Sequence, residues 1–329
     1  MMSFDIGKLK LEYGIALAPM AGFSDYAMRR VCHALGAEYS VTEMVSAKAV
    51  VYGDKKTARL AKIRADEGPV GLQIFGSEPS VMAEAAAILE KPIEDGVAPV
   101  LIDINMGCPV PKIFGNGEGS ALMKNPSLIY DIVKATKGAT SLPVSVKIRL
   151  GIDRAHINAV ECALAAEEAG AKMLTVHGRT RVEMYSGSAD MDEVARVREK
   201  IKIPLFANGD ITSAADAVRV LRHTGAEGVM IGRGAVGNPY IFSEIRAALS
   251  GAEYREPSLS ERADLALFQL GLAISEKGEE AAVLEARKQI ALYFKNFRGA
   301  AELRARINTA TTYDEVASAF AQMASEAQG

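Results

Sequence analysis

The chain has 329 residues, of which 49% are hydrophobic and 24% charged, and its formal net charge at pH 7 is -3. This composition is ordinary for a soluble α/β enzyme and excludes a disordered or fibrous chain. The net charge argues against a general polyanion binder, because lysine and arginine make phosphate contacts, but it leaves room for a local basic face.

Cysteine usage and the absence of long apolar runs indicate the compartment. Cys32, Cys108 and Cys162 are too few and too scattered for a disulfide framework, and none belongs to a CxxC pair. No basic segment followed by an apolar core stands at the N-terminus, and no run approaches the roughly 18 apolar residues of a membrane span. We expect a soluble protein of the reducing cytoplasm, without a membrane partner, that acts as a monomer.

Short β-rich runs alternate with longer amphipathic stretches, which is typical of βα units around a parallel sheet. The predicted strands are Ile15–Ala18, Tyr39–Thr42, Val70–Ile74, Leu101–Asn105, Val144–Ile148, Met173–Val176, Leu205–Ala207 and Gly228–Ile231. The clearest predicted helices are Asp25–Leu35, Ser80–Leu89, Ser127–Thr136, Ala155–Ala169, Ser213–His223 and Pro239–Leu249. Eight such units close a barrel, so the predicted fold is an α/β TIM (β/α)8 barrel.

The pattern changes beyond about Gly251. The segment GAEYREPS has the composition of a linker, and the sequence after it predicts helices without strands. At this length one large core with a small appendage is expected. We therefore predict a barrel over residues 1–250 and a small all-helical domain over residues 251–329.

TIM barrels carry their chemistry in the loops that follow the strands. Glycine-rich loops follow the last two predicted strands, in ANGDI and MIGRGAVGNP. This fold commonly binds phosphate there through backbone N–H groups, and Arg233 adds a fixed cation. Either loop alone is more simply a turn, but the pair at these two positions favours a phosphate site.

Two polar residues at strand ends suit a flavin. Lys147 lies in SVKIRL, where Val146 and Ile148 are expected to pack outside the barrel and the lysine to point inward. An inward ammonium would stabilise the negative charge of a reduced flavin; the alternative is a salt bridge in the barrel mouth. Gln73 has a donor and an acceptor that suit a flavin's imide edge, or it is an ordinary buried amide.

His177, in TVHGRT, lies close to Arg179 and Arg181. These neighbouring cations favour an anion or a uracil carbonyl as the partner of the histidine, and the alternative is a histidine with a purely structural role.

Cys108 stands in DINMGCPVPKIFGNGEGSALM, directly after a predicted strand. Cys32 and Cys162 lie on amphipathic helices and are interpreted as inert core residues. Cys108 instead lies between a glycine and a proline at the barrel mouth, where a thiol could donate a proton and a thiolate could attack carbon. No metal-ligand spacing, Walker motif or GxGxxG fingerprint accompanies it, so we expect no metal.

The motifs together resemble those of the tRNA-dihydrouridine synthases. They are LAPMAGFSD, DINMGCPVPK, SVKIRLG, TVHGRTR, ANGDI and MIGRGAVGNPYIF, in this order over the whole barrel. The segment ARKQIALYFKNFRGAAELRARIN looks like the family's C-terminal helical motif. Within the family the chain is most similar to the bacterial branch with the NGD and MIGR motifs.

The resemblance implies an FMN enzyme that uses NADPH to reduce the C5–C6 double bond of uridines in tRNA, with Cys108 as general acid. Residues 1–250 would bind FMN and residues 251–329 tRNA. By position in the motifs, the implied cofactor contacts are Pro19, Met20, Ala21, Gln73, Lys147, His177, Asn208, Gly209, Asp210, Gly232 and Arg233. The implied tRNA contacts are Asn105, Arg149, Arg179, Arg287, Lys288 and Lys295.

The C-terminal region is locally basic. Its cations are interleaved with aromatic residues: Arg287, Lys288, Lys295, Arg298, Arg304 and Arg306 alternate with Tyr293, Phe294 and Phe297. Such a run is commonly a solvated helix face over an aromatic core, but here we favour a surface for the tRNA backbone. The chain departs from the family pattern at Gln289, where many relatives are expected to have histidine.

Two other functions stay open at this point. A dihydroorotate dehydrogenase-like FMN barrel that reduces a free pyrimidine would not need the basic helices. A non-catalytic RNA-binding or regulatory barrel is disfavoured by the presence of Cys108, Lys147 and the two phosphate loops.

Overall fold

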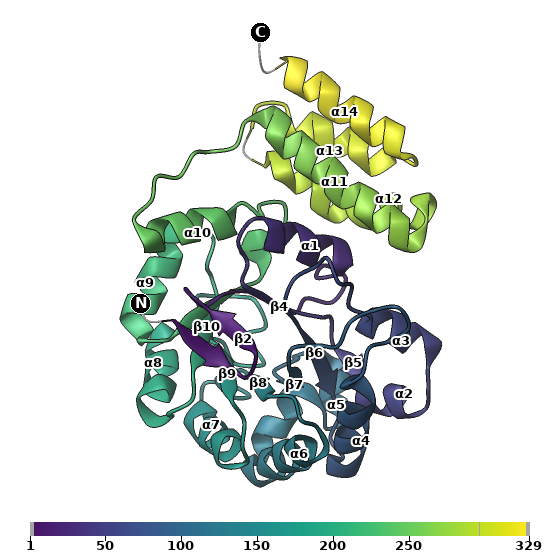
Figure 1. Cartoon of the computed structure of the whole chain (residues 1–329). Helices are drawn as coiled ribbons and strands as arrows, with labels where there is room; N and C mark the ends of the chain where they lie inside the picture. The colour runs from purple at the N-terminus through teal and green to yellow at the C-terminus, as the bar shows by residue number, and fades with distance from the viewer. Residues whose placement is uncertain (1–2, 296, 327–329) are drawn as a thin grey trace.

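The computed structural model describes residues 3–295 and 297–326. It shows a barrel of parallel strands surrounded by helices, with a bundle of helices from the C-terminal part of the chain at one side (Figure 1). Among the described residues, no helix is both long enough and apolar enough to cross a membrane.

The sheet closes on itself. Parallel pairing runs in the order β3, β4, β6, β7, β8, β9, β10 and β11, and β11 pairs with β3 to complete the ring. The strands are β3 Ile15–Leu17, β4 Tyr39–Val41, β6 Val70–Phe75, β7 Ile102–Met106, β8 Val144–Ile148, β9 Met173–His177, β10 Leu205–Asn208 and β11 Gly228–Ile231. All eight predicted strands and the TIM-barrel fold are confirmed, and a short strand β5, Val45–Ser46, adds to β6.

The helices on the outside of the barrel follow the strands. They are α1 Tyr26–Ala34, α2 Ala47–Val51, α3 Lys55–Ala61, α4 Pro79–Leu89, α5 Pro111–Gly115, α6 Pro126–Ala139, α7 Ala159–Glu168, α8 Met191–Lys200, α9 Ala214–Thr224 and α10 Ile241–Ser250. Helix α9 has both signals expected of its sequence: the Ser213 side chain accepts from the Asp216 N–H at its start, and Gly225 ends it in the left-handed conformation. Val146 and Ile148 of β8 pack in the apolar layer between strands and helices, so Ser145 and Lys147 face inward.

A hairpin that the sequence analysis did not predict closes the N-terminal end of the barrel. Strands β1 Phe4–Ile6 and β2 Leu9–Leu11 pair antiparallel. Ile6, Leu9 and Leu11 share a buried cluster with the inward side chains of the lower barrel, and the ring of Phe4 meets that of Phe206 at 6.1 Å. The barrel interior is therefore open only at the carboxyl ends of the strands.

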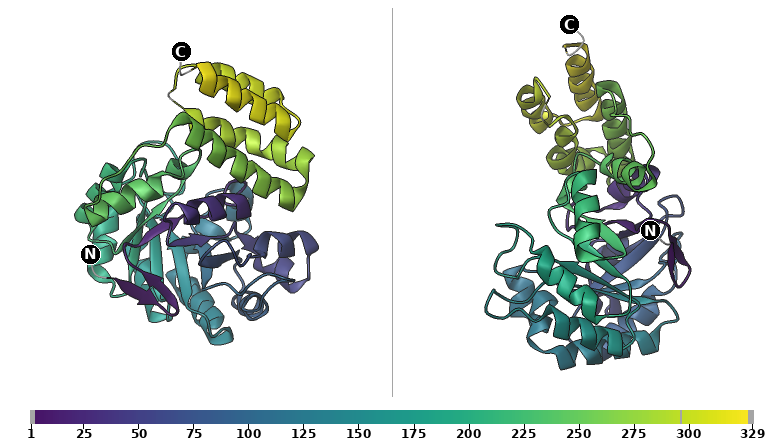
Figure 2. Two further views of the ribbon diagram at one scale, coloured as in Figure 1. Left: turned by 45° about the horizontal axis from the view of Figure 1, so that its top comes forward. Right: turned by 90° about the vertical axis from the view of Figure 1, so that its left-hand side faces the viewer.

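The C-terminal helices form a second core. They are α11 Leu259–Lys277, α12 Glu279–Ile290, α13 Ala300–Thr309 and α14 Tyr313–Glu326, with a 3-10 turn at Ala291–Phe294. Their buried cluster includes Leu270, Ile290, Phe294 and Phe320, and only Ala27 joins it from the barrel among the described residues. The views in Figure 2 show this bundle next to the dark purple helix α1, at one side of the barrel.

The bundle contacts two loops of the barrel. Tyr240, before α10, donates its hydroxyl to the Glu261 carbonyl at 2.9 Å. On the other side, Lys277 forms an ion pair with Asp25 at 2.7 Å. At Gly237, where φ is +71°, an added Cβ would lie 2.3 Å from the Cβ of Leu292, so the bundle approaches this loop too closely for any side chain. Both loops follow strands at the open end of the barrel.

A buried ion pair fixes the loop that leads from β3 to α1. Arg29 donates from Nε to Glu67 at 2.6 Å and from Nη1 to the Ser24 carbonyl at 2.8 Å, and both charged side chains are almost fully buried. Glu67 also accepts from the Arg64 N–H at 2.5 Å. The pair therefore connects the loop after β3 to the segment before β6.

Replacing Glu67 with alanine is expected to destabilise the fold by about 3–5 kcal/mol, because Arg29 would remain buried without its partner. Urea unfolding would measure the difference. Asp66→Ala is the matched control: its carboxylate is exposed and accepts from Tyr26 and Arg30 at the surface, so its loss should change stability by about 1 kcal/mol or less. Equal effects of the two substitutions would contradict this role of the buried pair.

Candidate active site

The open end of the barrel brings the predicted residues together. Each lies at or just after the carboxyl end of a barrel strand: Pro19, Met20 and Ala21 after β3, Gln73 in β6, Asn105 and Cys108 at β7, Lys147 and Arg149 at β8, His177 and Arg179 at β9, Asn208, Gly209 and Asp210 at β10, and Gly232 and Arg233 after β11. Because all strands are parallel in a closed ring, these residues surround one mouth.

A hydrogen-bonded network crosses the floor of this mouth. Gln73 donates from Nε2 to the carboxylate of Asp103 at 2.6 Å, and Ser145 donates to the same carboxylate at 2.5 Å. Asn105 donates from Nδ2 to Gln73 Oε1 at 2.8 Å. The Oδ1 atom of Asn105 in turn accepts from the Cys108 N–H at 2.9 Å. The network joins the buried interior of the barrel to the loop that carries the cysteine.

Lys147 lies beside this network without a carboxylate partner. Its Nζ donates to Asn208 Oδ1 at 3.1 Å, and the described residues form no ion pair with it. Burial in the barrel lowers the pKa of Lys147 to about 8, and the charge of Arg149 acts in the same direction, whereas Asp103 and Cys108 oppose the shift. The predicted inward orientation holds, and the alternative of a salt bridge in the barrel mouth does not describe this lysine.

Cys108 has little exposed surface, 9%, at the edge of the mouth. Three side chains hold its loop: Asn105 accepts from its N–H, Ser120 donates to its carbonyl at 2.8 Å, and Arg149 donates to the Gly107 carbonyl at 2.8 Å. Burial raises the pKa of the Cys108 thiol above its ordinary value, although Arg149 and Lys147 act against this. The thiol is therefore protonated at neutral pH, as a proton donor must be.

His177 is held neutral. Burial lowers its pKa far below the ordinary value, and the charges of Lys147, Arg149 and Arg179 lower it further. Nη1 of Arg179 lies 3.4 Å from the ring Nε2. A neutral imidazole at the mouth can either donate to or accept from a bound ligand.

Two arginines predicted to contact tRNA are buried instead. Arg179 is 1% exposed and donates to Asp210 and to the carbonyls of Ser186 and Gly187. Arg149 is 3% exposed and, besides Gly107, donates to the carbonyls of Thr180 and Met184 at 2.9 Å. Their donors hold the loops around the mouth, which argues against direct RNA contact by either guanidinium.

The two glycine-rich loops after β10 and β11 pack against each other. An added Cβ at Gly234 would lie 2.1 Å from the Ile211 carbonyl, so the loops meet with no room for a side chain. Gly209 has φ of +134°, which favours glycine. Asp210 accepts from the Ala189 N–H at 2.7 Å and lies 3.6 Å from Arg233, whose guanidinium is mostly exposed. Beside the mouth, these two loops present an exposed cation and a backbone that a ligand can approach closely, which are the features of a phosphate site.

The predicted basic residues of the bundle take different positions. Arg287 donates to the Ala310 carbonyl and so connects α12 to the end of α13. The Nζ of Lys288 lies 4.9 Å from the ring centroid of Phe23, in the loop after β3, and Lys288 and Lys295 are both exposed. Gln289 is buried and donates to the Gly22 carbonyl at 3.4 Å.

Two residues of the mouth were not predicted from the sequence. Asp103 stands two positions before Asn105 on β7, and the period of two along a strand could have placed its carboxylate inside the barrel. Tyr185, 54% exposed, lies in the loop after β9, with the guanidinium of Arg233 4.9 Å and that of Arg149 5.8 Å from its ring centroid. Its position depends on the fold of that loop, which no local pattern indicates.

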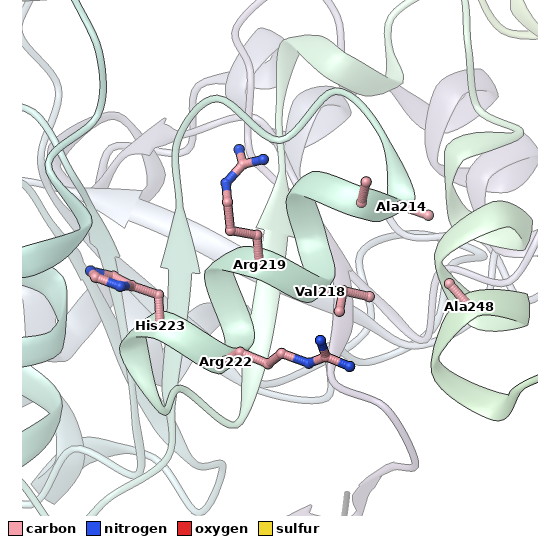
Figure 3. A pocket seen from close by; sticks show the side chains of 7 residues that line it. Ala214, Val218, Arg219, Arg222, His223 and Ala248 are labelled. Atoms are coloured by element: carbon pink, nitrogen blue, oxygen red, sulfur yellow. The ribbon is translucent and has the colours of Figure 1, made fainter.

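A separate hollow of about 720 Å³ lies between α9 and α10 on the outside of the barrel (Figure 3). Ala214, Val218, Arg222 and Ala248 line it together with Arg219 and His223, and none of the predicted site residues does. Over residues 3–295 and 297–326, no cluster of three or more His, Cys, Asp or Glu side chains could hold a metal ion.

The family model described as "Dihydrouridine synthase (Dus)" matches residues 16–328. The chain belongs to the dihydrouridine synthase family. Membership in this family makes it a flavin-dependent oxidoreductase, which agrees with the resemblance found in the motifs.

Similar proteins support this placement over nearly the full length. The chain is 41% identical to a Rickettsia conorii protein named "Probable tRNA-dihydrouridine synthase", over 92% of the chain and 91% of the relative. It is 39% identical to "tRNA-dihydrouridine synthase B" of Pseudomonas putida, over 94% of the chain and 90% of the relative. A solved structure titled "Crystal structure of TcOYE with pHBA" has the same barrel, with a TM-score of 0.55 at 12% identity over 79% of this chain and 95% of that one.

The raised pKa of Cys108 predicts how its thiol reacts. Since alkylation requires the thiolate, iodoacetamide should modify Cys108 more slowly at pH 7.5 than it modifies free cysteine, and the rate should rise as the pH passes above the ordinary pKa of a thiol. Mass spectrometry of the modified peptides would measure this. Cys32 and Cys162 are fully buried and serve as internal controls that should not react in the folded protein. Fast modification of Cys108 at pH 7.5 would contradict the protonated state.

Proposed function

We propose that this chain is a tRNA-dihydrouridine synthase that binds FMN, uses NADPH as its reductant and reduces the C5–C6 double bond of uridine with Cys108 as general acid. One observation carries the proposal. A protonated thiol and an ammonium that pairs with no carboxylate of the described residues lie at the same barrel mouth, close enough that each affects the pKa of the other. The proposal places the chain in the cytoplasm as a monomer.

The residues at the mouth fit FMN. Lys147 suits the pyrimidine edge of the isoalloxazine, where negative charge gathers on reduction, and Gln73 suits its imide group. Pro19, Met20 and Ala21 would lie against the ring, and His177 and Asn208 would complete the polar contacts. Gly209, Asp210, Gly232 and Arg233 would hold the phosphate through backbone N–H groups and one guanidinium. When bound, FMN supplies the hydride that is added at C6 of uracil.

Cys108 supplies the proton. Reduction of a double bond adds one hydride and one proton, so the carbon that does not receive the hydride, C5, must be protonated by an acid at the mouth. The buried Cys108 thiol keeps its proton at neutral pH and is held by Asn105, Ser120 and Arg149. Asn105 also has its amide at the mouth, where it would contact the uracil. Arg149 and Arg179 contribute by holding the loops in place.

The tRNA is proposed to lie across the mouth and the helical bundle. The family finding favours a nucleic-acid substrate over a free pyrimidine, because relatives that cover the same length of chain are named for tRNA. The target base must leave its stack to enter the barrel, so the RNA has to be held on both sides of it. Residues 1–250 would provide the catalytic barrel. Residues 251–329, with Lys288 against the loop after β3 and Lys295 exposed, would provide phosphate contacts.

Cys108→Ala is expected to leave the reduction of bound FMN by NADPH near the wild-type rate and to lower dihydrouridine formation by about a hundredfold or more, the usual contribution of a general acid. Stopped-flow absorbance of the flavin and mass spectrometry of digested tRNA would measure the two steps. Cys162→Ala removes a buried thiol from α7, away from the mouth, and should retain both. Wild-type product formation by Cys108→Ala would remove the general-acid assignment.

Lys295→Glu is expected to weaken tRNA binding and to lower the slope of log Kd against log salt concentration by about one, as for the loss of one phosphate contact. Filter binding over a series of salt concentrations would measure the slope. Lys172→Glu changes an exposed lysine by the same charge at the N-terminal end of β9, opposite the mouth, and should leave the slope unchanged. If both variants behave alike, the effect comes from net charge and Lys295 makes no specific contact.

A further inference from the structure

We infer that Asp103 is a positioning residue of the active site: its buried carboxylate sets the direction of the hydrogen bonds that run through Gln73 and Asn105 to the Cys108 loop, and it keeps Lys147 in its charged form. This inference rests on the proposed function for its catalytic meaning. The hydrogen bonds from which it is argued lie within the chain and do not depend on a bound ligand.

The direction of the network is fixed from one end by the backbone. The N–H groups of Gly107 and Cys108 can only donate, so the atom of Asn105 that faces them must be the oxygen. The other end of the Asn105 amide is then its Nδ2, which donates to Gln73 Oε1. The remaining Nε2 of Gln73 therefore needs an acceptor.

Asp103 supplies that acceptor. An ionised carboxylate accepts hydrogen bonds and cannot donate them, so it fixes the Gln73 amide from the opposite end. Gln73 and Asp103 are each 1% exposed, which leaves no water to replace a lost partner. With both ends fixed, Gln73 can present only one orientation to a ligand, and the Asn105 oxygen stays on the cysteine loop.

The same carboxylate lies on the strand beside Lys147: Asp103 pairs with Ser145 and Asn105 with Lys147 in the β7–β8 register, so the carboxylate and the ammonium enter the barrel two positions apart on neighbouring strands. The charged and titratable groups that face this ammonium are Asp103 on β7, Cys108 after β7, Arg149 after β8 and His177 on β9. The cations lower the pKa of Lys147, His177 is neutral, and Cys108 is protonated, so Asp103 is the anion that favours the charged form at neutral pH. Burial raises the pKa of Asp103 itself, and the hydrogen bonds from Gln73 and Ser145 act against that rise.

Asp103→Asn tests the charge without changing the volume. We expect Lys147 to lose its proton at a pH lower by about one unit or more, because a neighbouring anion has been removed. Titration of 13C-labelled lysine by NMR, with Lys147→Gln to assign the signal, measures this without FMN. In the enzyme with FMN and NADPH, the rate of flavin reduction should fall at alkaline pH, and in Asp103→Asn this fall should occur at a pH lower by the same amount. At a pH above the Lys147 pKa of both proteins, the variant should therefore reduce flavin about tenfold more slowly than the wild type.

Thr175→Val is the matched control. Thr175 lies inside the barrel on β9, is 1% exposed, and its hydroxyl has no hydrogen-bond partner among the described residues. The substitution keeps shape and charge, and Thr175 pairs with Lys147 in the β8–β9 register, so it changes the surroundings of the ammonium without removing an anion; the Lys147 titration and product formation should therefore stay close to those of the wild type.

Asn105→Asp keeps the inference testable if Asp103→Asn fails to fold. It retains the acceptor for Cys108 but places an oxygen against Gln73 Oε1, and it adds an anion on the strand neighbour of Lys147. The Lys147 titration should then move upward, opposite to the shift in Asp103→Asn, while dihydrouridine formation falls.

Two results would overturn the inference. One is a folded Asp103→Asn protein whose Lys147 titration and product formation match those of Thr175→Val. The other is an Asn105→Asp protein in which Lys147 titrates at or below the wild-type pH. If instead the wild-type chain binds no FMN, the proposed function fails, and the NMR titration of Lys147 still decides the role of Asp103.

Discussion

A closed parallel barrel with a plugged end imposes the constraint on which the site depends. The hairpin β1–β2 fills the N-terminal end with apolar side chains, so polar groups in the upper half of the strands have one opening. Inside it, each such group must bind another or face a ligand, since an unpaired polar group in the interior costs free energy. Asp103, Gln73 and Asn105 satisfy one another, whereas the neutral Asn208 is the one hydrogen-bond partner of Lys147 among the described residues. The ammonium of Lys147 therefore has N–H donors left over, and this indicates an anionic ligand at its position.

The electrostatics of the mouth differ from those of the whole chain. The net charge is -3, yet Lys147, Arg149, Arg179 and Arg233 gather around the opening. Burial lowers the pKa of His177 and of Lys147, and neighbouring cations lower both further. Burial has the larger effect at Cys108, where it keeps the thiol protonated although cations lie near. At the two basic groups burial and positive charge lower the pKa together, whereas at the thiol they oppose each other and burial dominates, and composition alone does not indicate this balance.

Local pattern was sufficient for the barrel and for much of the mouth. Alternating β-rich and amphipathic runs predicted all eight strands, and the strand ends then indicated Gln73, Lys147 and the glycine-rich loops. Local pattern did not predict the position of a side chain where contacts between distant segments of the chain determine it. Arg149 and Arg179 have the charge expected of RNA contacts, but they bind carbonyls of loops that approach only in the folded chain. The hairpin β1–β2 was missed because its two strands of three residues are too short to show a periodicity.

The same limit applies to Gln289, where the chain departs from the family pattern. This residue is 5% exposed and lies in a buried polar group in which Gln269 donates to its Oε1 and Tyr293 donates to Gln269. Its own amide donates to the carbonyl of Gly22, in the loop that follows Pro19–Ala21. The residue therefore faces the barrel and away from solvent, so its identity bears on how the bundle is attached to the cofactor side of the mouth. Since the loop after β11 is also in contact with the bundle at Gly237, a displacement of the helices would act on the two loops proposed to hold FMN.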